Sequence, residues 1–174
     1  PNITTVNICV THTGGGGGGN SDPDLAVTSF TLTPSTVCPG TTITADYTVE
    51  NNTGNTVSAA SPVGFWIVPV GQGCPTSVPA GSPIEYNNLT VNEMSDDIEY
   101  EYEYITIDAN TQPGDYYIVC VLDHSGLLTE SDENNNIYCE IVTVTAPPTI
   151  TATANPSTII AGQTTTVSAT GATS

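Results

Sequence analysis

The sequence contains no lysine and no arginine among its 174 residues, against 18 aspartates and glutamates, so its formal net charge is −18 at pH 7. A chain without guanidinium or ammonium groups has no charged fork for phosphate and cannot neutralise a nucleic-acid backbone or an anionic bilayer. Conventional surface ion pairs are excluded for the same reason, so stability must come from strand pairing, burial and disulfides. We therefore expect no nucleic-acid partner.

Long hydrophobic runs are also missing, because the longest apolar stretches are no longer than a strand. Such stretches are too short to cross a bilayer, so we expect no direct membrane insertion. The five cysteines contain no Cys-x-x-Cys motif, which disfavours metal clusters and thioredoxin-like redox chemistry. Cysteines used in this way indicate an oxidising compartment, and we expect an extracellular protein, either secreted or at the cell surface.

What the chain does have is strand and turn chemistry, with short β-branched runs separated by Gly, Pro, Asn and Asp clusters. In the run from Thr42 to Glu50, the side chains of Ile43, Ala45, Tyr47 and Val49 fall on one face. About seven strands at this spacing, with no convincing helix, predict an all-β, immunoglobulin-like antiparallel sandwich. The predicted strands are Leu25–Leu32, Thr42–Glu50, Pro62–Val70, Ile84–Val91, Asp97–Ile107, Tyr116–Asp123 and Asn136–Thr145.

The flanks divide the chain further, into an N-terminal strand (1–13), a Gly-rich linker (14–21), the sandwich (22–146) and an incomplete C-terminal hairpin (147–174). The stretch from Pro34 to Thr42 is echoed from Pro156 to Thr164 with the same Pro-to-Gly distance, so the last segment resembles the opening hairpin of a second sandwich. The N-terminal strand more weakly echoes the last strand of the sandwich. Two interpretations stay open: a segment of a tandem array, or a subunit that lends its N-terminal strand to a neighbour.

Several short motifs in the central segment occur in an order typical of one domain family. They are Asp22-Pro23-Asp24-Leu25, Pro39-Gly40, Asn51-Asn52, Pro113-Gly114-Asp115 and, most specifically, the run from Glu130 to Asn136. Residues 22–145 thereby resemble the cell-adhesion-related module called CARDB, found in bacterial and archaeal surface proteins. The resemblance implies an extracellular, non-catalytic, adhesive or structural role and offers no active site to transfer, so we expect no enzymatic activity.

The strand Asp97–Ile107 alternates acidic and aromatic residues: Glu99, Glu101 and Glu103 share one face, while Tyr100, Tyr102 and Tyr104 share the other. We expect the glutamates to face solvent and the tyrosines to pack inward. The same carboxylates could also bind Ca²⁺, which takes oxygen ligands, and Asp132 in the Glu130–Asn136 segment is a further candidate. That segment contains residues that more often close turns through local hydrogen bonds, so both roles stay open.

The disulfide pairing is predicted from strand order. Cys120 and Cys139 lie in the last two strands, which a long hairpin places side by side, and form our first pair; Cys38 and Cys74 lie in loops and form the second. Cys9 then remains unpaired, or it crosslinks to another chain. Asp123-His124-Ser125 contains the residue types of a catalytic triad, but consecutive side chains cannot form that relay.

Two functions fit these observations. The first is a repeating unit of an extracellular filament, in which copies of the chain join by strand addition through the alternating residues Ile3, Val6, Ile8 and Val10. The second is a carbohydrate- or calcium-binding accessory module, whose exposed aromatics would form a flat platform drawn from Tyr100, Tyr102, Tyr104, Tyr116 and Trp66. Asn2, Asn51 and Asn88 lie in N-glycosylation sequons and are candidate sites for attached glycans.

Overall fold

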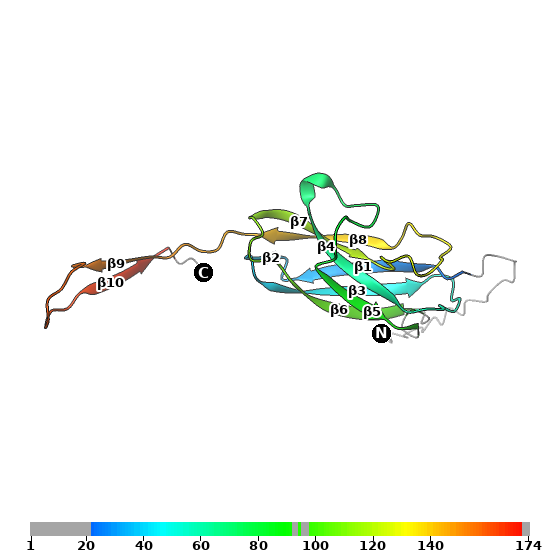
Figure 1. The fold of residues 1–174 in the computed structure, drawn as a ribbon, viewed down its shortest axis with the longest axis horizontal. Coiled ribbons are helices and arrows are strands. Elements are labelled where there is room, and N and C mark those ends of the chain that lie inside the picture. The colour runs from blue at the N-terminus through cyan, green and yellow to red at the C-terminus, as the bar shows by residue number, and fades with distance from the viewer. Residues whose placement is uncertain (1–21, 92–93, 95–97, 172–174) are drawn as a thin grey trace, which may run out of the picture.

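The computed structural model describes residues 22–171, except 92–93 and 95–97. It consists of a β-sandwich followed by a separate two-stranded hairpin (Figure 1). The predicted N-terminal strand and the Gly-rich linker lie outside the described residues. The sandwich strands are β1 (Leu25–Thr33), β2 (Thr36–Val37), β3 (Thr42–Asn51), β4 (Ser61–Pro69), β5 (Glu85–Leu89), β6 (Ile98–Thr106), β7 (Gly114–Val121) and β8 (Ile137–Val144).

The two sheets of the sandwich have the strand orders β1-β3-β6 and β2-β8-β7-β4-β5. All pairs are antiparallel except β2 with β8, which run parallel over two residues. Each of the seven predicted strands is present, with every end within two residues of the predicted one, and the immunoglobulin-like sandwich is confirmed. The two-residue strand β2 was not predicted, because a stretch this short between two prolines carries no periodic signal.

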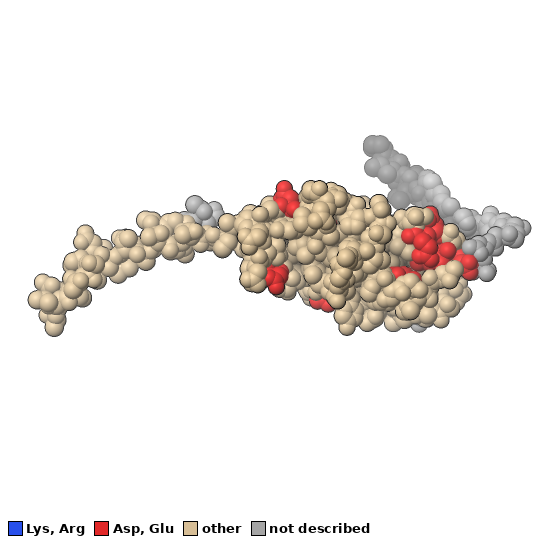
Figure 2. Space-filling model, turned by 45° about the horizontal axis from the view of Figure 1, so that its top comes forward, with Lys and Arg blue, Asp and Glu red and all other residues tan. Residues whose placement is uncertain are grey.

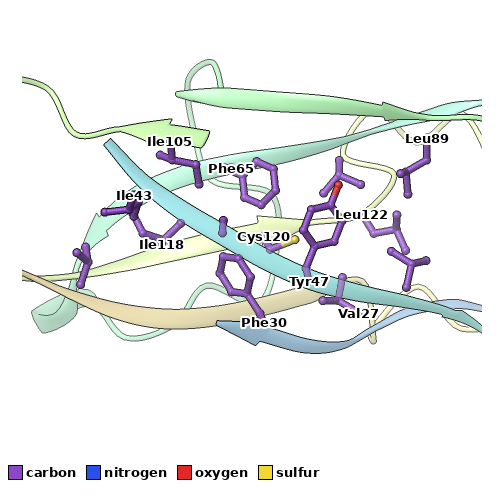
Figure 3. Close-up of a cluster of buried hydrophobic side chains, with 14 of the residues drawn as sticks. Val27, Phe30, Ile43, Tyr47, Phe65, Leu89, Ile105, Ile118, Cys120 and Leu122 are labelled. Carbon is purple, nitrogen blue, oxygen red and sulfur yellow. The ribbon is translucent and has the colours of Figure 1, made fainter. Parts of the chain in front are cut away.

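The main core lies between the two sheets, and its largest side chains are fully buried (Figure 3). As predicted, Ile43, Ala45, Tyr47 and Val49 all point into it from β3. The Phe65 ring lies 6.1 Å from the Phe30 ring and 5.6 Å from the Tyr47 ring, which joins the two sheets through aromatic contacts. Asn87 donates a 3.0 Å hydrogen bond to the Tyr47 hydroxyl, so this buried polar group is satisfied, and burial raises the Tyr47 pKa.

A second, smaller core covers the outer face of the five-stranded sheet. Trp66, Val119 and Val121 are buried there beneath the loop between β4 and β5, and Trp66 donates its indole N–H to the Gly81 carbonyl at 3.2 Å. A Cβ atom at Gly64 would lie 2.5 Å from the Trp66 ring and 2.8 Å from His124, so glycine is required for this close approach. The loop is therefore part of the fold.

The disulfide that holds this loop joins Cys74 to Cys139, with a Cα–Cα distance of 6.0 Å. Our predicted pairs, Cys120–Cys139 and Cys38–Cys74, are therefore wrong. In the β7–β8 ladder Val119 is opposite Cys139, and Cys120 is opposite Tyr138. This offset of one residue places the two thiols on opposite faces of the sheet. Cys120 is buried in the main core, where burial raises its pKa, while Cys38 is half-buried; neither is in a disulfide within the described residues.

The C-terminal hairpin repeats the geometry of the first hairpin of the sandwich. It consists of β9 (Thr151–Asn155) and β10 (Thr166–Thr170), and every residue of both strands is exposed. Asn155 precedes a proline and pairs with Thr166, just as Thr33 precedes a proline and pairs with Thr44. Gly162 and Gly40 lie six residues after those prolines, and both have a positive φ. The internal repeat predicted from the sequence is therefore also present in the strand register of the two hairpins.

Candidate functional site

The side chains of β6 point in the direction opposite to our prediction. Glu99, Glu101 and Glu103 are half-buried, on the side of the sandwich interior, and the three tyrosines face solvent. The physical reason is that alternate residues of a strand share a face. The glutamates share theirs with Ile105, which is fully buried opposite Ile43. The apolar residues at the end of this strand were the sequence signal that identifies its inner face.

The inward glutamates lie where β6, an edge of one sheet, approaches β5, an edge of the other. Asn87 of β5 donates a 3.2 Å hydrogen bond to Glu101 of β6 across this gap. Burial raises the pKa of Glu103, and repulsion from the Glu85 carboxylate adds to the shift. Inward-pointing charges on an edge strand disfavour the addition of a further strand. We infer that this side of the sandwich resists edge-to-edge pairing.

The outer side of the three-stranded sheet forms the most distinctive surface, which we call the tyrosine face. It consists of the outward side chains of β1, β3 and β6, which the register places in rows across the sheet. The first row is Thr33, Thr44 and Tyr104, the second is Thr31, Asp46 and Tyr102, and the third is Ser29, Thr48 and Tyr100. A shallow depression of about 360 Å³ lies over the second and third rows. The hydroxyl residues were missed from the sequence, although they occupy alternate positions of both predicted strands.

The predicted calcium ligands do not form one group. The three glutamates lie on the inner face of β6, whereas Asp132 lies in the loop before β8, where it accepts hydrogen bonds from the backbone and side chain of Asn134. These bonds lower the Asp132 pKa. Across the described part of the chain, no three His, Cys, Asp or Glu side chains come together as a cation site.

The Glu130–Asn136 segment instead fastens the start of β1 to the loop before β8. Glu130 accepts hydrogen bonds from the Leu25 backbone N–H at 2.6 Å and from the Asn136 side chain at 3.0 Å. Asn135 donates to the Asp24 carboxylate at 2.8 Å. These are the motif residues that carry the family resemblance, and in this structure they close a turn and join two distant segments. On the side shown in Figure 2, acidic side chains gather near the end of the sandwich away from the hairpin.

Burial of Glu130 raises its pKa from 4.5 to about 7. Protonated Glu130 is thus favoured in the folded state, and its stabilising contribution is full below about pH 4.5 and lost as the pH rises through 7. Lowering the pH from 8 to 5 should therefore increase the free energy of unfolding, by at least about 1.4 kcal/mol for one pKa unit. In E130Q this gain should shrink, which urea denaturation at several pH values measures.

High salt provides the control for this pH effect, because the net charge of −18 also produces repulsion that protonation relieves. At 1 M salt the screening length is only about 3 Å, so surface repulsion is strongly reduced while the burial of Glu130 remains. Equal pH dependence of wild type and E130Q at 1 M salt would contradict the assignment to Glu130.

In the Asp123-His124-Ser125 segment the Ser125 hydroxyl lies 3.4 Å from Nδ1 of His124, whereas the hydrogen bonds of Asp123 go to other partners. The Asp123 carboxylate is buried and accepts hydrogen bonds from the backbone N–H groups of Leu127 and Leu128, at 3.0 and 2.9 Å. It also accepts a hydrogen bond from the Ser61 hydroxyl. The His124 ring packs edge-on against Trp66. Asp123 therefore organises the turn after β7.

One of the three candidate glycosylation sites is wrong. Asn51 is buried, and its side-chain N–H₂ group donates to the carbonyls of Asn55 and Met94 at 2.8 and 3.3 Å. An attached glycan would break these bonds. Asn88 is exposed on β5 and stays a prediction, as does Asn2, which lies outside the described residues.

Two further predictions, strand exchange through the N-terminal strand and the lack of direct membrane insertion, are not tested by the described residues. The strand-exchange residues Ile3, Val6, Ile8 and Val10, and Cys9 beside them, lie outside the described residues. Within the described ranges, no helix is long and apolar enough to cross a membrane.

Comparison with known proteins supports the resemblance found in the sequence. The CARDB family matches residues 22–140. Among solved structures, a CARDB domain from Pyrococcus furiosus, determined in complex with di-metal ions, is 20% identical with a TM-score of 0.53, covering 74% of this chain and 99% of that one. A domain assigned to a cell-surface protein of Methanosarcina acetivorans is 21% identical with a TM-score of 0.48, covering 71% and 93%. No curated protein matches the chain.

Proposed function

Because the chain belongs to the CARDB family, a family of surface-protein modules, we propose that it is a repeating structural unit of an extracellular filament. In this proposal, copies join by strand addition at the C-terminal hairpin. The observation that carries it is the β9–β10 hairpin, which has the register of β1–β3 but no facing sheet among the described residues.

The hairpin has one apolar and one polar face. Ala154 pairs with Val167 and Ala152 pairs with Ala169 on the first face, whereas the pairs on the second consist of Thr, Ser and Asn. In the sandwich the equivalent face of β1–β3 is buried against the five-stranded sheet. An exposed apolar face of this kind is stabilised when another strand or sheet covers it.

The internal repeat suggests how the partner strand would lie. In the sandwich, Thr36 and Val37 pair in parallel with Thr143 and Val144 of the last strand, β8. The repeat places Thr158 and Ile159 in the positions of Thr36 and Val37. Residues 1–13 echo the last strand in sequence, so the N-terminal strand of one copy would pair beside Thr158 and Ile159 of the next. Calcium is no part of this proposal, because its candidate ligands lie on different elements.

The test compares two charge substitutions on neighbouring residues of β10 in the full chain. V167D places a carboxylate on the apolar face, whereas S168D places the same charge on the polar face. We expect the wild type and S168D to form polymers that sedimentation and electron microscopy detect, and V167D to stay monomeric.

Deletion of residues 1–13 tests the donor strand separately. The truncated chain should form no polymers, and an added peptide of residues 1–13 should bind it. A full-length chain that stays monomeric at every concentration would overturn filament assembly, and polymers that persist without residues 1–13 would overturn this strand as the donor.

A further inference from the structure

The tyrosine face holds three aromatic side chains that a folded monomer does not need to expose. Tyr100, Tyr102 and Tyr104 are 75%, 58% and 60% exposed. The rings of Tyr102 and Tyr104 pack edge to face at 5.7 Å, so they support each other's orientation. Aromatic rings arranged in this way on a rigid strand are pre-organised for binding.

The outward polar side chains beside the rings are the hydroxyls of Ser29, Thr31 and Thr48 and the carboxylate of Asp46. Together with Tyr100 and Tyr102 they line the depression over the face, and Tyr47 and Glu101, whose side chains belong to the inner face, complete the lining. Among the described residues, no hydrogen bond reaches the Asp46 carboxylate, which leaves it available as an acceptor. Binding sites for small polar ligands commonly combine aromatic walls with a few hydroxyl and carboxylate groups.

The charge pattern selects the ligand class. Glu99, Glu101 and Glu103 point to the opposite side of the strand, and the chain has no Lys or Arg to bind an anion. A net charge of −18 repels acidic polymers, so sulfated or carboxylated glycans and nucleic acids are disfavoured. With hydroxyls and flat rings in place of a dense carboxylate cluster, the surface fits a neutral, polyhydroxylated ligand.

We propose that the tyrosine face binds a neutral polysaccharide, independently of filament assembly. The apolar C–H faces of successive sugar rings stack on Tyr100, Tyr102 and Tyr104. The sugar hydroxyls donate hydrogen bonds to Asp46 and exchange hydrogen bonds with the hydroxyls of the neighbouring Thr and Ser side chains. Tyrosines two residues apart on a strand are about 7 Å apart, so the three span about 14 Å. This length suits a chain of sugars rather than a single one, as expected at the outer surface of a cell.

Affinity electrophoresis of the full chain tests the proposal, with gels that each contain one neutral polysaccharide: hydroxyethyl cellulose, xylan, mannan or laminarin. Heparin serves as the acidic polymer. We expect retardation in at least one neutral gel and none in heparin. Y102A, at the centre of the face, should weaken that binding at least about tenfold, as truncation of a central aromatic anchor does.

The matched control is Tyr86 of β5, which is 57% exposed but belongs to the other sheet. Y86A should bind as the wild type does, and thermal denaturation establishes that both variants are folded. Absence of retardation in all neutral gels would overturn the proposal, and so would equal binding by wild type and Y102A. If the chain instead bound only polylysine, with loss of binding in D46N, the face would belong to a cationic partner and the proposal would fail.

Discussion

Replacing both Cys74 and Cys139 with serine should lower the free energy of unfolding by about 4 kcal/mol. The bond closes a loop over a sequence separation of 65 residues, and the chain-entropy model gives about 4 kcal/mol for a loop of this length. The bond also holds the β4–β5 loop over Trp66, so the small outer core should become accessible to solvent. Urea denaturation monitored by the fluorescence of this single tryptophan measures both effects.

The control for the disulfide is C38S, because Cys38 is half-buried and lies in no described disulfide. We expect C38S to change stability by less than about 0.5 kcal/mol, as substitutions outside the core usually do. A double serine variant that unfolds at the wild-type urea concentration would show that Cys74–Cys139 contributes little, and reduction of the wild type should match the variant.

The second large effect is expected at Asp123. D123A removes the acceptor of three hydrogen bonds and leaves the N–H groups of Leu127 and Leu128 and the Ser61 hydroxyl without it. Hydrogen bonds to a charged group contribute about 1.5–3 kcal/mol each and are not additive, so we expect a loss of about 3–5 kcal/mol. Asp123 also has a φ of 45°, which alanine adopts less readily than aspartate or asparagine.

Two variants make the Asp123 result specific. D123N keeps one acceptor oxygen and tolerates the positive φ, so it should lose less than half as much stability as D123A. D108A removes a carboxylate that accepts from the Asn110 backbone in an exposed turn, and should cost less than about 1 kcal/mol. Similar losses in D123A and D108A, measured by urea denaturation, would contradict the role assigned to burial.

Alternation and turn residues were sufficient to predict the sandwich, because these signals are local. The strand Thr42–Asn51 was predicted within one residue, and its inner face of Ile43, Ala45, Tyr47 and Val49 was predicted correctly. The motif from Glu130 to Asn136 also identified the family, and its turn role follows from the short-range hydrogen bonds of Asp132.

The inner face of β6 and the disulfide pairing were harder to predict from the sequence, since both depend on which strands become neighbours. The inner face of β6 could be identified only at the end of the strand. There the set of alternating glutamates continues into the apolar Ile105, whereas the set of tyrosines continues into the polar Thr106. The thiols of Cys120 and Cys139 are in adjacent strands as predicted, yet a register offset of one residue separates them by the thickness of the sheet. The tyrosine face required both sheet order and register, neither of which is local.

The Cys74–Cys139 link has a mechanical consequence for a module pulled from its two ends. When force opens the sandwich, the segment enclosed by the bond cannot be drawn out, because the covalent ring bypasses it. At about 3.4 Å per extended residue, the intact disulfide reduces the maximum extension of the chain by about 220 Å. In the proposed filament, the oxidation state of Cys74 and Cys139 would thus set how far each unit stretches under load.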